Sequence, residues 1–333
     1  MTERLASFLD DAFGDRAPLH VEPMAGGGSC DLFLLVRGGA RLVLRRAPAH
    51  ASSATAHDVT REFRILDAVK GTGVRVPLPV VACDDPAVFG GPFYVMAHVD
   101  GVPVRGGIPA AWAADRASQR RAFEELIDAL VDVHAVDWEA VGLDGLGRPE
   151  HFLERQVPRW LAQLASYGGR DLPGAHSVAT WLDANRPPEQ APALFHGDYK
   201  ADNVLYAPSS PPRLLAIVDW EMASIGDPLV DVAWALIFHP AAGQAMSLGM
   251  RGEHVFDRAS VPSAAELLDR YAAGSGRDLT HMRWYDVFAR WKLAIALEGS
   301  YAKWQRGEST KPVHEYFGRQ ADALLTEAER LLS

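Results

Sequence analysis

The stretch that decides the fold is HisGlyAspTyrLysAlaAspAsnValLeuTyr at residues 196–206, followed by LeuLeuAlaIleValAspTrpGlu at 214–221. The first segment has the pattern H-x-D-x-x-x-x-N, a loop in which Asp198 can point to an acceptor hydroxyl while Asn203 reaches back to a metal ion. The second segment is an apolar strand that ends in an acid, Asp219, which can hold magnesium. Together the two segments predict a phosphoryl-transfer site.

The same polar cluster also has a purely structural interpretation. Asp198 and Asn203 can close a turn, and Asp219 can cap the element that follows. The pattern H-x-D-x-x-x-x-N alone would leave that interpretation open. Because the apolar strand and its terminal acid follow at a suitable distance, we favour the functional interpretation.

Several neighbours of this cluster are expected to be structural. His196 should brace the loop by a hydrogen bond, and Asp227 and Asp231 should hold the start of the next helix, since Asp before Pro is common there. Lys200 lies either near the transferred phosphoryl group or in solvent, and the sequence does not decide between them. Glu221 either helps to hold a metal ion or, as we prefer, caps the following segment.

The first hundred residues have the pattern of an antiparallel sheet. Residues 21–46 alternate with period two and contain glycines, which predicts a strand, a Gly-rich turn at 26–29, a strand, a hairpin turn at 38–39 and a strand. Residues 57–70 carry Val59, Phe63, Leu66 and Val69 on one face, as in an amphipathic helix. Two further strands are predicted at 76–83 and 93–99.

Beyond residue 100 the pattern is mainly helical. AspGlyValPro at 100–103 is typical of a linker, and the predicted helices are 118–136, 150–167, 176–185, 228–240, 263–273 and 281–305. The sequence therefore predicts an α+β fold with two lobes. Residues 1–99 would form the small β-rich, nucleotide-binding lobe, and residues 100–333 the larger α-helical lobe with the catalytic and metal loops.

Composition limits the partners and the compartment. The chain has 33 basic and 43 acidic side chains, and its formal charge of −10 argues against nucleic acid as a partner. The two cysteines do not support a disulfide framework. Neither a signal peptide nor an apolar run long enough for a membrane span is seen, so no membrane association and a cytoplasmic location are expected.

The chain resembles the aminoglycoside phosphotransferase family, and within it most closely the kinase-like domains found beside, or fused to, acyl-CoA dehydrogenases. Besides 196–206 and 214–221, the resemblance is carried by GlyGlyGlySer (26–29), ValLeuArgArg (43–46), ArgGluPheArgIleLeu (61–66), GlyProPheTyrValMet (91–96) and TrpTyrAspValPhe with LysLeuAla (284–294). The resemblance implies a bilobal fold like that of protein kinases. It also implies a functional link to an acyl-CoA dehydrogenase, either as a physical partner or only as a pathway neighbour.

The resemblance further implies a role for each matching residue. Asp198 would be the catalytic base, and Asn203 and Asp219 would be the magnesium ligands. Arg45 would stand where relatives have the lysine that grips ATP, with Glu62 as its ion-pair partner, although both could be surface charges. The remaining nucleotide contacts would come from the turn formed by Gly26, Gly27, Gly28 and Ser29 and from the hinge at 94–99, which includes Met96 and Val99.

With ATP and Mg²⁺ as cofactors, the expected activity is phosphoryl transfer to a hydroxyl of a small molecule. Arg155, Trp160, Lys292 and Trp304 should wall the acceptor side, where basic residues would suit an anionic acceptor such as a hydroxyacyl-CoA. An aminoglycoside or other antibiotic phosphotransferase shares every motif and differs only in the acceptor pocket. A nucleotide-binding pseudokinase is the non-enzymatic alternative, but none of the catalytic acids is missing.

Overall fold

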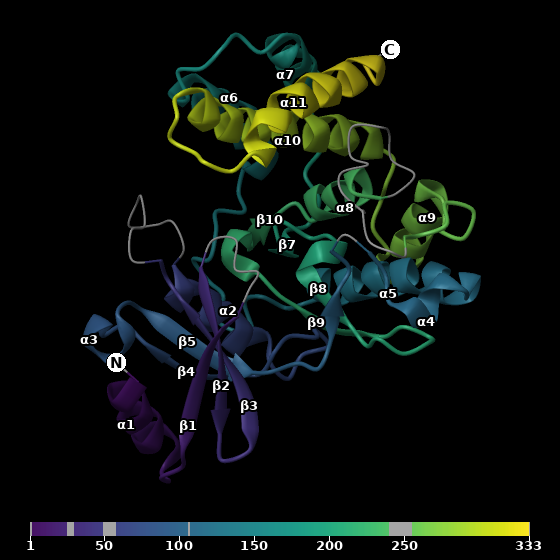
Figure 1. Ribbon diagram of the computed structural model, residues 1–333. Helices are drawn as coiled ribbons and strands as arrows, with labels where there is room; N and C mark the ends of the chain where they lie inside the picture. Colours follow the sequence, from purple (N-terminus) through teal and green to yellow (C-terminus); the bar gives the residue numbers. More distant parts are fainter. Residues whose placement is uncertain (1, 25–29, 49–57, 106, 240–254, 333) are drawn as a thin grey trace.

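The computed structural model describes residues 2–24, 30–48, 58–105, 107–239 and 255–332. A β-sheet with a few helices is followed by a mainly helical region, so the chain has the predicted α+β, two-lobed organisation (Figure 1). Among the described residues, no helix has the length and the apolar content that crossing a membrane requires.

Five antiparallel strands form the N-terminal sheet in the order β1-β2-β3-β5-β4. The strands are β1 (Leu19–Met24), β2 (Asp31–Arg37), β3 (Ala40–Arg46), β4 (Pro79–Cys83) and β5 (Phe93–Ala97). Three helices belong to this region: α1 (Thr2–Phe13), α2 (Val59–Val69) and the short α3 (Pro86–Phe89).

The alternation of side chains in β3 gives the sheet two different faces. Leu42 and Leu44 pack with Leu9 of α1 in a small core on one face. Val43 and Arg45, which point the opposite way, line a cavity on the other face, together with residues of α2 and of the helical region. The period of two therefore places a charged side chain at the boundary between the two parts of the chain.

The helical region is built around one long helix and its neighbours. Its helices are α4 (Ala110–Ala113), α5 (Arg116–His134), α6 (Phe152–Ser166), α7 (Ala175–Ala184), α8 (Leu229–Ile237), α9 (Ala264–Ser275), α10 (Met282–Gln305) and α11 (Val313–Arg330). Figure 1 shows α10 and α11 lying side by side at the far end of the molecule from the sheet, where they pack together.

Two small sheets lie between these parts and carry the polar segments. One contains β6 (Val102–Pro103), β8 (Val204–Tyr206) and β9 (Leu214–Ile217), and the other contains β7 (Ala193–Phe195) and β10 (Ser224–Gly226). In the first, Val204 is paired with Ile217, and the Val218 N–H donates to the carbonyl of Asn203 at 2.9 Å. This pairing brings the loop before β8 next to the loop after β9.

Some predicted bounds were wrong. The strand expected from residue 76 begins at 79, because Pro77 cannot supply a backbone donor to a ladder, whereas Pro79 is tolerated as the first residue of a strand. The strand expected to reach 99 ends at Ala97. Helix α11 was not predicted. Its apolar residues Ala321, Leu324, Leu325 and Ala328 have helical spacing, and they are buried.

Candidate active site

The loop from His196 to Asn203 is held in place by a buried carboxylate. Asp231, in the first turn of α8, accepts the backbone N–H groups of His196 and Gly197 through its two oxygens. His196 is fully buried, and its Nε2 lies 3.0 Å from the carbonyl of Val218. These contacts fit the expected bracing role of His196 and the structural role of Asp231.

Asp198 lies at the centre of a compact set of donors. Its Oδ1 accepts from Trp234 Nε1 at 2.8 Å, its Oδ2 accepts from Asn203 Nδ2 at 2.9 Å, and Lys200 Nζ lies 2.7 Å from both oxygens. Burial opposes the charged form of Asp198, but the Lys200 ammonium and these hydrogen bonds outweigh it and lower its pKa. The group is therefore a carboxylate at neutral pH, as a proton acceptor must be.

Asp219 follows β9 in a strained backbone conformation. Its φ of +70° lies in the left-handed region, which few non-glycine residues adopt, and such residues cluster at functional sites. Its Oδ1 accepts from Arg45 Nη2 at 2.7 Å, and Arg45 Nε lies 2.7 Å from a carboxylate oxygen of Glu62. Glu62 also accepts the N–H of Trp220, the residue that follows Asp219.

The Arg45–Glu62 pair is not a surface pair, because only 8% and 2% of the two side chains is exposed. Burial disfavours the Arg45 cation, but the charges of Glu62 and other neighbours outweigh it and raise the pKa of Arg45. Glu221, for which the sequence favours a capping role over a metal role, has an oxygen 3.5 Å from Arg45. The pair thus joins β3, α2 and the segment after β9.

These residues line one cavity of about 470 Å³ between the sheet and the helical region. Its wall includes the predicted residues Arg45, Glu62, Met96, Val99, Asp198, Asn203 and Asp219, and also Lys200. The predicted phosphate turn, Gly26 to Ser29, lies outside the described residues. The cavity thus brings together residues that were predicted to act on the nucleotide, the metal and the acceptor hydroxyl, whereas Glu221 lines a neighbouring cavity.

The donor atoms of Asn203 and Asp219 suit Mg²⁺, which takes oxygen ligands and is usually held by one or two protein groups together with substrate phosphates. Asn203 donates through Nδ2 to Asp198, which leaves its amide oxygen available as an acceptor. Within the described residues, no group of three or more His, Cys, Asp or Glu side chains forms a metal cage. A divalent ion held by Asn203 and Asp219 would complete its shell with water and substrate phosphates.

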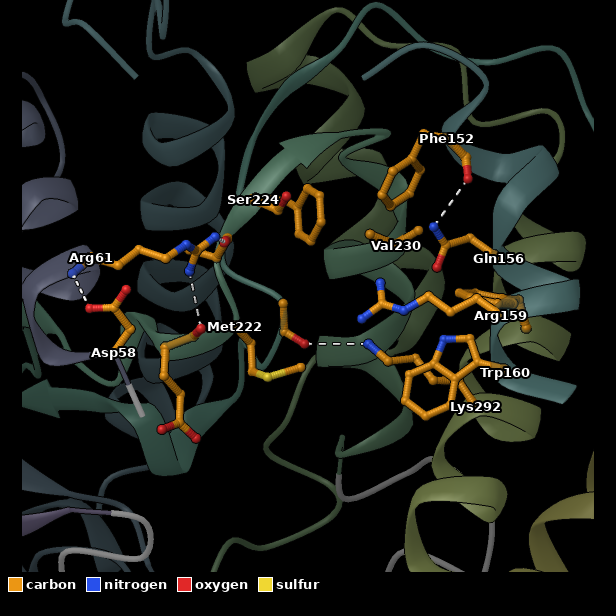
Figure 2. A pocket seen from close by; sticks show the side chains of 15 residues that line it. Asp58, Arg61, Phe152, Gln156, Arg159, Trp160, Met222, Ser224, Val230 and Lys292 are labelled. Carbon is orange, nitrogen blue, oxygen red and sulfur yellow. Dashed lines mark hydrogen bonds between the residues drawn. The ribbon is translucent and has the colours of Figure 1, made fainter. Parts of the chain in front are cut away.

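A second cavity, of about 390 Å³, lies beside the loop and is lined by Gly197. Figure 2 shows Trp160, Arg159 and Lys292 on one side of it, and Asp58, Arg61 and Met222 on the other. Two of the four residues predicted for the acceptor wall, Trp160 and Lys292, therefore line one cavity beside the loop.

Arg155 lines an adjacent cavity, where its guanidinium donates to the carbonyls of Glu150 and Arg148. Trp304 lines none of these cavities, because it lies three turns beyond Lys292, about 18 Å along α10.

Two residues at the site were not singled out from the sequence. Trp234 holds Asp198, and its position three residues after Asp231 on α8 was the available signal, since such residues share a helix face. Arg61 donates to the carbonyls of Glu221 and Ala223, which ties α2 to the segment after Asp219. Only the fold reveals the contacts of Arg61, because they join distant parts of the chain.

Comparison with known proteins gives matches over nearly the whole chain. The sequence pattern of the phosphotransferase enzyme family matches residues 20–285. The acyl-CoA dehydrogenase family member 11 of Gallus gallus is 33% identical over 90% of this chain, and the match covers 38% of that relative, so the chain spans about two fifths of its length. A candidate aminoglycoside phosphotransferase of solved structure from Ralstonia eutropha has a TM-score of 0.85 at 29% identity, covering 100% of this chain and 98% of the other.

A more distant structure has the same fold. It is an aminoglycoside phosphotransferase in a ternary complex with ADP and hygromycin B, with a TM-score of 0.63 at 14% identity, and the match covers 98% of each chain.

Proposed function

The chain belongs to the phosphotransferase enzyme family. We propose that it is a small-molecule kinase that transfers the γ-phosphoryl group of ATP, with Mg²⁺, to a hydroxyl acceptor. The observation that carries the proposal is the convergence of Asp198, Asn203 and Asp219 on one cavity with the buried Arg45–Glu62 pair. Phosphoryl transfer needs chiefly positioning and charge stabilisation, and this set supplies both.

In this proposal the residues divide the work by their chemistry. Asp198 accepts the hydroxyl proton, while Trp234 and Asn203 fix the direction of its oxygens. Asn203 and Asp219 hold Mg²⁺, which would neutralise charge on the phosphate oxygens. Arg45 offers a planar cation to phosphate, and Glu62 keeps its guanidinium in place.

Lys200 is a further cation of this cavity. It faces Asp198 in the structure, and its ammonium would be attracted to the phosphoryl group during transfer. Backbone groups of the turn from Gly26 to Ser29 and of the hinge at Met96 and Val99 would contact the rest of the nucleotide.

For the acceptor we propose a hydroxyacyl-CoA, working in functional association with an acyl-CoA dehydrogenase. Two observations support this choice: the similarity to a relative that bears the name of an acyl-CoA dehydrogenase, and the cationic side chains Lys292 and Arg159 in the second cavity. An aminoglycoside acceptor is the alternative, which the name of the Ralstonia protein favours. A polycation would meet repulsion at Lys292 and Arg159.

The test measures ADP release from Mg-ATP with hydroxyacyl-CoAs, aminoglycosides and small amino alcohols as acceptors, and identifies the phosphorylated product by mass spectrometry. We expect transfer to the hydroxyacyl-CoAs. Transfer to aminoglycosides alone would support the antibiotic alternative. Tight Mg-ATP binding without transfer to any acceptor would support the pseudokinase alternative and contradict the proposal.

A further inference from the structure

Lys292 is a lysine held between aromatic rings beside the catalytic loop. Its Nζ lies 4.3 Å from the ring centre of Trp234 and 5.7 Å from that of Trp160, and it faces the second cavity (Figure 2). Aromatic faces attract a cation, but they do not satisfy its hydrogen bonds. A residue in this position normally needs oxygen partners.

The oxygen partners within the chain are few. The hydrogen bond from Lys292 to the carbonyl of Gly197 is long, at 3.5 Å, and Lys292 forms no ion pair with any carboxylate of the described ranges. An ammonium group has three donors, and leaving them unsatisfied in a partly buried place costs free energy. The geometry therefore leaves donor capacity directed toward the cavity.

The acids of the same cavity are already engaged elsewhere. Asp58 caps α2 by accepting the N–H of Arg61 at 2.9 Å, and Glu221 has an oxygen 3.5 Å from Arg45. On the side of Lys292, the cavity is lined by a second cation, Arg159. This wall is suited to oxygen atoms of a ligand and not to ammonium groups.

Trp234 joins this cation to the catalytic acid. The indole N–H of Trp234 donates to Asp198 at 2.8 Å, and the face of the same indole lies against Lys292. A ligand that reaches both Asp198 and Lys292 would therefore place its hydroxyl at the N–H edge of the Trp234 indole. It would place an oxygen acceptor next to the face of the same indole.

We propose that Lys292 is a positioning residue that donates a hydrogen bond to an acyl oxygen of the acceptor, either a carboxylate or a thioester carbonyl, while the acceptor hydroxyl faces Asp198. This inference rests on the phosphotransferase function proposed above. It deepens that function, because it makes an acyl oxygen a requirement for recognition and disfavours polycations. Lys292 acts by orienting the acceptor, and Asp198 remains the group that takes the proton.

The decisive variant is Lys292→Met, which keeps the length and apolar stem and removes the donors. Lys292→Arg keeps a cation, and Lys303→Met makes the same change at an exposed position of α10 as a matched control. Each is assayed with hydroxy acids, their CoA thioesters, and diols and amino alcohols of equal chain length. Mg-ATP affinity, measured separately, reports whether each variant retains the folded nucleotide site.

We expect wild type to prefer the acids or thioesters over the matched diols and amino alcohols. Lys292→Met should raise KM for the preferred class by roughly 10- to 100-fold, as expected for loss of a hydrogen bond to a charged group, with a smaller change in kcat. Lys292→Arg should restore part of this loss, and Lys303→Met should show none. Preference for acids indicates a carboxylate partner, and preference for thioesters a carbonyl partner.

The pH dependence of the KM for the acceptor distinguishes this role from a merely structural one, because a structural lysine would not affect it. Burial lowers the pKa of Lys292 to about 8, and the charged groups that face it are Asp231 and Asp198, which favour the cation, and Arg159 and Lys200, which oppose it. The KM for the acceptor should therefore rise above about pH 8 in wild type. Lys292→Arg should remove this rise, because a guanidinium stays charged.

Two results would overturn the inference and leave the phosphotransferase function standing. One is efficient transfer to amino alcohols or aminoglycosides that Lys292→Met does not weaken, and the other is an unchanged KM in Lys292→Met for every acyl acceptor. Failure of wild type to bind Mg-ATP is a distinct result, since it would contradict the proposed function itself.

Discussion

Lys200 and Asp198 form an ion pair at the point where the acceptor hydroxyl would lose its proton, with Nζ 2.7 Å from both carboxylate oxygens. The charge of Lys200 therefore helps to set the proton affinity of the proposed base. A base with a low pKa stays ionised over a wide pH range, but it accepts a proton less readily.

Lys200→Met should move the acid limb of the pH profile of kcat/KM to higher pH. Lys200 lowers the pKa of Asp198, so removing its charge raises that pKa, and the active carboxylate is then lost at a higher pH as the solution is acidified. The measurement is kcat/KM from pH 4 to 9, with Lys303→Met as the control. An acid limb at the same pH in both variants would show that Asp198 does not govern it.

Lys292→Met should also make the protein more stable at pH 7, by about 1–3 kcal/mol. Burial lowers the pKa of Lys292 to about 8 from an ordinary 10.5. Between these two pH values the unfolded chain binds more protons than the folded chain, so the stability of the wild type rises with pH there. The gain from the substitution should shrink over the same window. Urea unfolding at pH 7 and pH 10 tests this, and equal gains at both would contradict it.

The sequence was sufficient to predict residues that line the first cavity and one ion pair between them, but not the other partners of Asp198. The spacing from Asp198 to Asn203 and the acid at the end of the next strand are local patterns. The Arg45–Glu62 ion pair was expected from the resemblance, and it is buried in the structure. The hydrogen bond from Trp234 to Asp198 could not be predicted from a local pattern, because it depends on how α8 packs over the loop.

At the scale of elements, the loop before β8 depends on the close approach of two backbones. Gly197 has a φ of +86°, and a side chain there would overlap the carbonyl of Met222, in the segment after Asp219. This contact joins the two segments that carry Asp198 and Asp219. The glycine is therefore required by both its conformation and its surroundings.

Gly197→Ala should be more destabilising than Gly145→Ala. Gly145 has a φ of +77° and no atom near its missing side chain, so alanine there should cost only the strain of the left-handed conformation, about 1–2 kcal/mol. Gly197→Ala adds the overlap with Met222, about 1–3 kcal/mol more, and should lower kcat as the loops separate. Thermal unfolding of both variants measures the difference, and equal losses would argue against this account of the loop.

Strand and helix types were predictable where periodicity was strong, as in β2, β3, α2 and α10. Prediction failed at β4, where proline shortens the ladder, and at α11, although its buried apolar residues have helical spacing. The boundary between the two lobes, placed between residues 99 and 100, remains a prediction. The turn at Gly26–Ser29 also remains one, because it lies outside the described residues.

At the scale of the whole molecule, the first cavity takes its walls from both the sheet and the helical region, from Met24 to Trp220. A ligand bound there would contact both regions at once. Its binding energy would therefore stabilise the two regions together, since a ligand that binds only the folded chain shifts the unfolding equilibrium.

Mg²⁺ and a non-hydrolysable ATP analogue should raise the free energy of unfolding by about 2.7 kcal/mol when the analogue is at 100 times its Kd. The same analogue without Mg²⁺ should give a smaller increase, and Asp219→Asn should reduce the effect of Mg²⁺, because one of its proposed ligands is weakened. Thermal denaturation with and without each component measures this. A magnesium effect that persists unchanged in Asp219→Asn would exclude Asp219 as a ligand.

The central claim is that Asp198 is the base for phosphoryl transfer from Mg-ATP to a hydroxyl. The most direct measurement is kcat for product formation at saturating Mg-ATP and acceptor in wild type, in Asp198→Asn and in Asp171→Asn, a matched change at an exposed aspartate. We predict that Asp198→Asn loses roughly 10²- to 10⁴-fold in kcat and still binds Mg-ATP, while Asp171→Asn matches wild type. Turnover by Asp198→Asn at the wild-type rate would contradict the account.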